Sequence, residues 1–146
     1  MNLLAYLFEI LEIKIHTLIK KELFQGPLKP LLENPHIGKI GQHLKYDTHV
    51  LANHGISLQG IVFDTMLASY VLDATATRHN LDDLAKHYLN YQTTTFEELA
   101  GKGVKQLTFD QIEIDAASNY ACEDADITLR LKELFVPKLL AEPSLN

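Results

Sequence analysis

The sequence has no tryptophan, a single cysteine and no excess of positive charge. The one cysteine, Cys122, cannot form a disulfide within the chain, which fits a reducing compartment, and we expect a cytoplasmic protein. The formal net charge is −6, from 13 basic and 19 acidic residues. Proteins that hold duplex DNA over their whole surface need clustered lysines and arginines, so this charge balance argues against that class.

The sequence also lacks any apolar run long enough to cross a bilayer, and we expect no membrane association. The N-terminal segment, residues 1–23, is predicted to form one amphipathic helix over residues 2–21, because its apolar residues recur at helical spacing. Glu9 and Glu12 interrupt the apolar stripe and no basic residue precedes it, which argues against a signal peptide. An unpaired apolar stripe over residues 4–18 would favour self-association.

The remainder, residues 24–146, is predicted to be an α/β domain with more helix than strand. Asp64 is placed to cap the helix that follows it, because its carboxylate can accept hydrogen bonds from the first amides of that helix. Cys122 is expected to be a small buried residue beside the core. Strands are predicted at 37–41 and 58–63, and helices at 27–33, 47–53, 65–72, 81–89, 96–100, near Phe109, and from 116 to 140 with a kink near Pro137.

Two short stretches contain residue types suited to phosphate chemistry. In the last predicted helix, Tyr120 and Asp124 are four residues apart and therefore lie on one face. A carboxylate can hold a hard divalent cation, and a phenol can orient a water molecule. The alternative is an ordinary amphipathic helix with solvated acids. The second stretch, residues 41–47 (GQHLKYD), follows a predicted strand and enters a helix.

Together these stretches resemble the second and third exonuclease motifs of the proofreading domain of bacterial DNA polymerase I. That family consists of ribonuclease H-like 3′–5′ exonucleases whose site has four acids and a tyrosine. Residues 97–110 (EELAGKGVKQLTFD) resemble a loop specific to polymerase I. The resemblance runs from about residue 28 to 140 and implies a ribonuclease H-like fold, a mixed sheet flanked by helices. Residues 1–23 lie outside it, so we expect 24–146 to be a partial exonuclease domain.

The motif match implies a role for each matching residue. Asp47 and Asp124 would be catalytic residues that bind metal, and Tyr120 would orient the attacking water. The resemblance implies two Mg²⁺ or Mn²⁺ ions in the family, since these hard cations prefer carboxylate oxygens.

The resemblance also implies contacts with nucleic acid. Gln42, Lys45 and Arg78 occupy positions that resemble the DNA-contacting residues of the family, although each would equally suit a solvated surface position. The implied substrate is the frayed 3′ end of single-stranded DNA. Proofreading would need a polymerase as a separate partner chain, unless this chain is a split or truncated gene product.

The sequence lacks the family's first motif, an Asp-x-Glu on the first strand. No aspartate precedes Asp47, and Glu9 and Glu12 do not match that spacing. Two divalent cations about 4 Å apart repel by roughly 17 kcal/mol at an effective dielectric constant near 20. Two carboxylates leave about +2 of the charge of two such cations unneutralised, so we expect at most one weakly held ion. Because the first motif is missing, we also expect a fold without its first strands. His43 stands where the family usually has asparagine.

Two functions therefore remain open at this stage. The first is the 3′–5′ exonuclease of a DNA polymerase I-like protein, in which two-metal hydrolysis of the 3′-terminal phosphodiester is impaired in this chain. The alternative is a catalytically inactive, truncated remnant that at most binds nucleic acid weakly.

Overall fold

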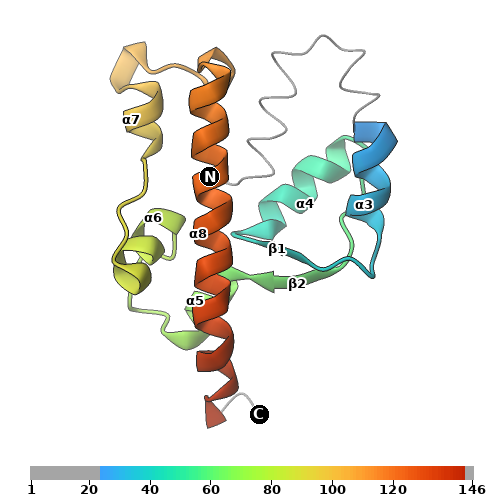
Figure 1. Cartoon of the computed structure of the whole chain (residues 1–146), viewed down its shortest axis with the longest axis vertical. Helices are drawn as coiled ribbons and strands as arrows, with labels where there is room; N and C mark the ends of the chain where they lie inside the picture. Colours follow the sequence, from blue (N-terminus) through green and yellow to red (C-terminus); the bar gives the residue numbers. More distant parts are fainter. Residues whose placement is uncertain (1–23, 144–146) are drawn as a thin grey trace.

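A computed structural model describes residues 24–143 as a helix-rich α/β fold (Figure 1), which confirms the predicted class. The predicted helix 2–21, and with it the segment 4–18, lies outside the described residues. No helix in the described range is long and apolar enough to cross a membrane. The first half contains the π-helical turn η1 (Phe24–Leu28), α3 (Lys29–Glu33), β1 (Lys39–Gly41), α4 (Leu44–Asn53), β2 (Ile61–Asp64) and α5 (Thr65–Leu72).

The second half consists of helices and the loops that join them. Its elements are α6 (Leu81–Leu84), which continues into the π-helical turn η2 (Ala85–Leu89), then α7 (Phe96–Ala100), the single turns η3 (Gly103–Lys105) and η4 (Phe109–Gln111), and the long helix α8 (Ile114–Leu140). The predicted helices 65–72 and 96–100 are confirmed with unchanged bounds. The last predicted helix is also confirmed, but it begins two residues earlier than expected and continues through Pro137 to Leu140.

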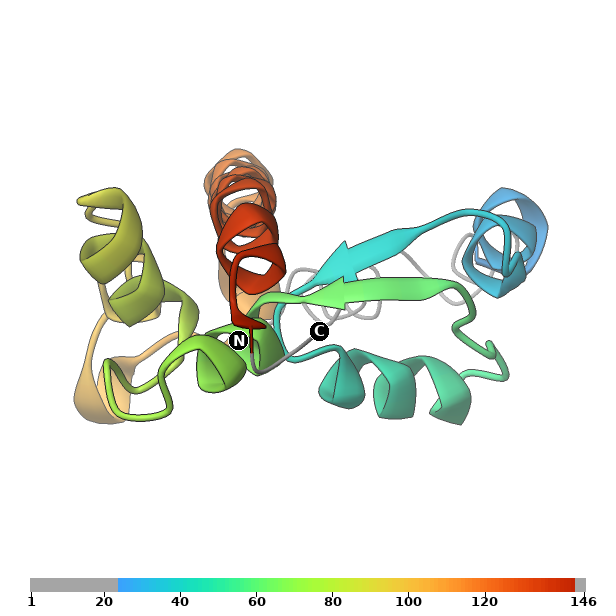
Figure 2. The ribbon, with the colours of Figure 1, turned by 90° about the horizontal axis from the view of Figure 1, so that it is seen from below.

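The two strands of the described chain pair in parallel, with Gly41 opposite Asp64 at their carboxyl ends. Figure 1 shows both arrowheads pointing toward α8, and β1 contacts that helix. Figure 2 shows α4 and α5 on one side of the strand pair and α8 on the other. In parallel sheets, ligands bind outside the carboxyl ends of the strands. A site is therefore expected beyond Gly41 and Asp64, on the side where β1 contacts α8.

The helix α8 is shared by two parts of the core. Its C-terminal half contributes Ile127, Leu131 and Phe135, each with 0% of its surface exposed, to a cluster with α5, α6 and η2. Its N-terminal half contributes Ala117 and Tyr120 to a second cluster with the segment 96–112. Apolar residues at i, i+4 and i+8 put one stripe of the helix against both clusters. A third cluster packs α3 against α4 and contains Leu32, Leu44, Leu51, Ile56 and Leu58.

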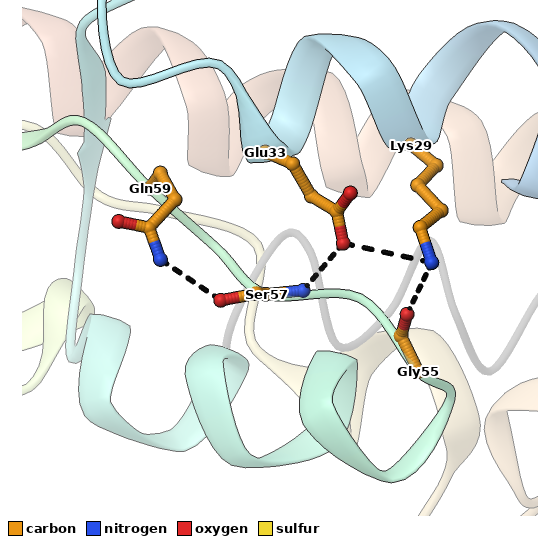
Figure 3. A network of polar contacts seen from close by, with 5 residues as sticks. All are labelled: Lys29, Glu33, Gly55, Ser57 and Gln59. Carbon is orange, nitrogen blue, oxygen red and sulfur yellow. Dashed lines mark hydrogen bonds and ion pairs between the residues drawn. The ribbon is translucent and has the colours of Figure 1, made fainter.

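A polar network fixes α3 against the loop that leaves α4 (Figure 3). The Lys29 ammonium donates to the Gly55 carbonyl at 2.6 Å and lies 3.6 Å from the Glu33 carboxylate. The same carboxylate accepts the Ser57 amide at 2.9 Å, and the Ser57 hydroxyl accepts the Gln59 side-chain amide at 2.8 Å. These contacts close the loop between α4 and β2 and so help to set the direction in which β2 enters the sheet.

Both strands are shorter than predicted. Gly60 has φ 72°, and a Cβ on it would lie 2.5 Å from the Ile37 carbonyl oxygen. The chain therefore turns sharply at a place where only glycine fits, and regular pairing starts after it. The expectation that residues 37–41 form a buried strand is only partly met, because Ile37 is 39% exposed. The burial expected for Cys122 was wrong, because α8 turns this thiol to the solvent-facing side, away from the stripe that packs on the core.

Asp64, at the end of β2, caps α5 as predicted: its carboxylate accepts the amides of Met66 at 2.9 Å and Leu67 at 3.2 Å. The same carboxylate accepts the amides of His43 at 3.1 Å and Leu44 at 2.7 Å, where α4 begins. One side chain thus satisfies two donors at each of two helix N-termini, which would otherwise be orphaned. It also fixes the point at which the chain turns from β1 into α4.

We expect Asp64→Ala to lower the free energy of unfolding by about 2–3 kcal/mol, because a lost cap costs about 1 kcal/mol and two helix starts are affected. The free energy of unfolding of Asp64→Asn, which keeps one acceptor oxygen, should lie between those of wild type and Asp64→Ala. Urea unfolding would measure the change, with the exposed Glu133→Ala as the matched control. Equal stability of Asp64→Ala and Glu133→Ala would show that the cap is not holding the two helices.

Candidate functional site

Asp47 lies in the first turn of α4, directly beyond the carboxyl end of β1. Its side chain is only 2% exposed, so α4 turns this carboxylate inward although the helix surface on either side is solvated. A negative charge in the first turn is favoured by the helix dipole. Local structure explains where Asp47 lies. β1 ends at Gly41, and the Asp64 carboxylate fixes the start of α4 at Leu44, three residues before Asp47.

Tyr120 and Asp124 lie one turn apart on the buried face of α8, as predicted, with 7% and 4% of their surfaces exposed. The Tyr120 ring packs against that of Phe109, with 6.3 Å between ring centroids. Asp124 accepts no hydrogen bond from the described residues. Burial raises the pKa of the Asp124 carboxyl from its ordinary 3.8 to about 7, and the nearby carboxylates of Asp82 and Glu123 add to that shift.

The two acids lie on α4 and α8, which are linked through β1. β1, which leads into the turn of Asp47, contacts α8, which carries Asp124, and Figure 1 shows this junction at the arrowheads of both strands. Within residues 24–143, no group of three or more histidine, cysteine, aspartate or glutamate side chains has the arrangement of a metal site. Carboxylate oxygens are the ligands that a hard cation prefers, and two carboxylates suit a single ion that keeps several waters.

Two acids beside Asp124 have structural roles. Glu123 accepts the Tyr91 hydroxyl and the Thr94 amide, both at 2.8 Å. The hydrogen bond from the Tyr91 hydroxyl to Glu123 raises the pKa of the Tyr91 phenol. Asp126 lies 3.5 Å from the half-buried Arg130. Both carboxylates are thus engaged with the 91–94 segment or the helix surface, and neither joins Asp124 in a cluster.

The three residues expected to contact DNA have different surroundings. Gln42 is 6% exposed and both ends of its amide are used within the protein: Nε2 donates to the His79 carbonyl at 2.8 Å, and Oε1 accepts the Thr65 hydroxyl. Lys45 and Arg78 are exposed. As the molecule stands, only these two of the three have side chains free to reach a nucleic acid, and the DNA-contact role of Gln42 stays a prediction.

Arg78 lines an open surface groove with a volume of about 710 Å³. Besides Arg78, the groove contains the cationic Lys86, the imidazole of His87 and the carboxylate of Asp83. The hydroxyl-bearing residues Thr75 and Thr77 complete its polar lining. Basic side chains and hydroxyls are the groups that contact phosphates in nucleic-acid complexes.

Sequence reasoning missed the second partner pair of Asp64 and the whole surroundings of His79. His79 is 2% exposed and has φ 60°, a conformation that non-glycine residues rarely adopt. His43 adopts the same left-handed conformation, with φ 60°. One signal in the sequence could have predicted the left-handed backbone at position 43. The family usually has asparagine there, and asparagine is enriched at positive φ.

Comparison with known proteins identifies relatives over most of the chain. A family described as 3′–5′ exonuclease matches residues 5–140, a range that includes most of the N-terminal segment 1–23. DNA polymerase I of Pseudomonas aeruginosa is 61% identical over 120 residues, which are 81% of this chain and 13% of that protein. The DNA polymerase I of Rhizobium leguminosarum is 44% identical over 114 residues, 78% of this chain and 11% of that protein. This chain therefore spans only about an eighth of the length of such relatives.

The raised pKa of Asp124 predicts a pH-dependent stability. Since the folded chain holds this proton up to about pH 7 and the unfolded chain releases it near pH 4, the folded state binds more protons between these values. The free energy of unfolding should therefore fall as pH rises through this window, by roughly 2–4 kcal/mol. Asp124→Asn, which is neutral at every pH, should lack this fall and be the more stable protein at pH 8.

Urea unfolding at pH 4.5, 6 and 8 would measure the difference between wild type and Asp124→Asn. Asp115→Asn, an exposed aspartate on the same helix, is the control and should leave the pH dependence unchanged. A difference between wild type and Asp124→Asn that stays constant over this range would contradict an elevated pKa.

Proposed function

Because this chain belongs to the 3′–5′ exonuclease family of bacterial DNA polymerase I, with its ribonuclease H-like fold, we propose that it acts on the 3′ end of single-stranded DNA. The reaction would be hydrolysis of the terminal phosphodiester, releasing one nucleotide at a time. The observation that best supports it is the pair of buried carboxylates, Asp47 and Asp124. The first lies in α4, the helix that follows β1, and the second lies in α8, the helix that β1 contacts.

Each residue has a role in this proposal. Asp47 and Asp124 would hold a divalent cation, Mg²⁺ or Mn²⁺, which when bound supplies positive charge at the scissile phosphate. The Tyr120 hydroxyl, one helical turn from Asp124, would orient the attacking water by a hydrogen bond. In this proposal the phenol is a positioning donor rather than a base.

The DNA would approach over two exposed cations. Lys45 lies two residues before Asp47 on α4, and Arg78 lines the groove beside α6. With a net charge of −6, the chain must place its cations locally to attract a strand, and single-stranded DNA can follow such a narrow path. Proofreading would need a polymerase domain, which the relatives' names attach to the longer proteins that contain this region.

The metal site of this chain alone is incomplete in the proposal. Two carboxylates neutralise only half the charge of two divalent ions, so we expect one weakly bound ion and slow hydrolysis. A second candidate function is a remnant without catalysis. It is supported by the lack, within residues 24–143, of any group of three or more side chains that could hold a metal ion.

A nuclease assay separates the two candidates. The full chain would be incubated with 5′-labelled single-stranded DNA and Mn²⁺, beside Asp124→Ala and the exposed Asp115→Ala. We expect a slow one-nucleotide ladder from the 3′ end that Asp124→Ala reduces at least about 100-fold and Asp115→Ala leaves unchanged. No ladder from a folded chain at high protein concentration would favour the remnant, and a ladder insensitive to Asp124→Ala would contradict the assigned site.

Metal stoichiometry gives an independent check. Titration calorimetry with Mn²⁺ should detect at most one ion per chain, bound weakly, because the site proposed among the described residues has two carboxylates, Asp47 and Asp124. Tight binding of two ions per chain would show that other acids complete the site and would contradict the expected impairment.

A further inference from the structure

The imidazole of His79 has both nitrogens engaged in the protein interior. Nδ1 lies 2.8 Å from the Ser69 hydroxyl of α5, and Nε2 lies 3.1 Å from the Ala74 carbonyl oxygen. The ring also stacks on Tyr70 of α5, with 3.7 Å between centroids. With only 2% of its surface exposed, this histidine is not available to a substrate.

The protons of this arrangement can be assigned from its partners. A carbonyl only accepts hydrogen bonds, so Nε2 carries a proton and donates it to Ala74. The Ser69 hydroxyl has a single proton and lies 2.7 Å from the Met66 carbonyl and 2.8 Å from Nδ1. A neutral ring accepts that proton at Nδ1, and a protonated ring would donate to Ser69, which then donates to Met66.

The main chain of His79 links further segments. Its amide donates to the Thr77 hydroxyl at 2.9 Å, within the loop 73–80. Its carbonyl accepts the Gln42 side-chain amide at 2.8 Å, across 37 residues of sequence. The other end of that amide accepts the Thr65 hydroxyl at the start of α5. The residue therefore joins the loop 73–80, α5 and the junction between β1 and α4.

That junction and that loop carry the two halves of the proposed site. Gln42 lies five residues before Asp47, in the turn where β1 gives way to α4. Arg78 directly precedes His79 and lines the open groove with Thr75 and Thr77 of the same loop. The left-handed backbone at His79, φ 60°, separates an exposed arginine from a buried ring in consecutive residues.

We propose that His79 is a positioning residue of the exonuclease: its buried ring anchors the loop 73–80 on α5, so that Arg78 faces the groove while the His79 carbonyl holds Gln42 ahead of Asp47. The inference rests on the proposed function and deepens it. Through His79, the groove that contains Arg78 and the start of α4, which carries the proposed metal ligand Asp47, are held in a fixed relative position. His79 touches neither DNA nor metal and acts through Arg78 and Gln42.

The variant His79→Asn tests the ring apart from the backbone. Asparagine tolerates positive φ, so the loop conformation stays accessible while the contacts to Ser69, Ala74 and Tyr70 are lost. Hydrogen exchange of the full chain should accelerate at least about tenfold in residues 42–47 and 73–80, and stay unchanged in the core half of α8. His36→Asn, an exposed histidine, is the control and should change neither segment.

Ser69→Ala, which removes the partner of Nδ1 and the hydroxyl contact to the Met66 carbonyl but keeps the His79 ring, should accelerate exchange in the same two segments to a smaller extent. This milder variant keeps the test decisive if His79→Asn does not fold. Acceleration confined to residues 73–80, with 42–47 unaffected, would overturn the proposal, as would uniform acceleration throughout α8, which would mean that His79 serves global stability alone.

A DNA-binding cycle tests the link to Arg78. By fluorescence anisotropy with a labelled single-stranded oligonucleotide, Arg78→Ala and His79→Asn should each raise Kd several-fold, and the double variant should be no weaker than Arg78→Ala alone. Additive effects would overturn action through Arg78. Absence of binding by the wild type would contradict the proposed function instead, and the exchange experiment would still decide whether His79 positions the two segments.

Discussion

The described fold depends on one carboxylate, Asp64, that receives four backbone amides from two helix N-termini. A two-stranded sheet has few ladder hydrogen bonds of its own, so the geometry at its carboxyl end must be fixed by other contacts. By holding the starts of α4 and α5 together, this side chain determines where Asp47 lies relative to β1. The metal-binding candidate is thus placed by a residue that has no need to touch the metal.

The long helix α8 combines two demands that oppose each other. Its apolar stripe binds two parts of the core together through Ile127, Leu131 and Phe135. The same buried face carries Asp124, whose raised pKa records the cost of keeping a carboxylate out of water. A cation at that place would favour the charged form and offset this cost. A buried acid retained on the main packing helix is consistent with a role in chemistry rather than in stability.

The sequence predicted the parts of this structure that depend on local patterns. The apolar periodicity of 116–140, the capping of α5 by Asp64 and the spacing of Tyr120 and Asp124 were all readable, because each involves residues within about one helical turn. The bridging of Asp64 to His43 and the anchoring of His79 by Ser69 and Gln42 were not, because they join residues 10 to 37 positions apart. Cys122 was misjudged because a small thiol suits either side of a helix, and the face it occupies depends on how α8 packs.

The proposed function requires that Asp47 of α4 and Asp124 of α8 hold one cation together. Amide spectra of ¹⁵N-labelled protein with substoichiometric Mn²⁺ test it most directly, because the ion broadens only the signals near it. We expect the amide signals of the first turn of α4 and of the turn of α8 around Asp124 to broaden together, and Asp124→Asn to abolish both effects. Broadening centred on exposed acids elsewhere, or in only one of the two helices, would contradict it.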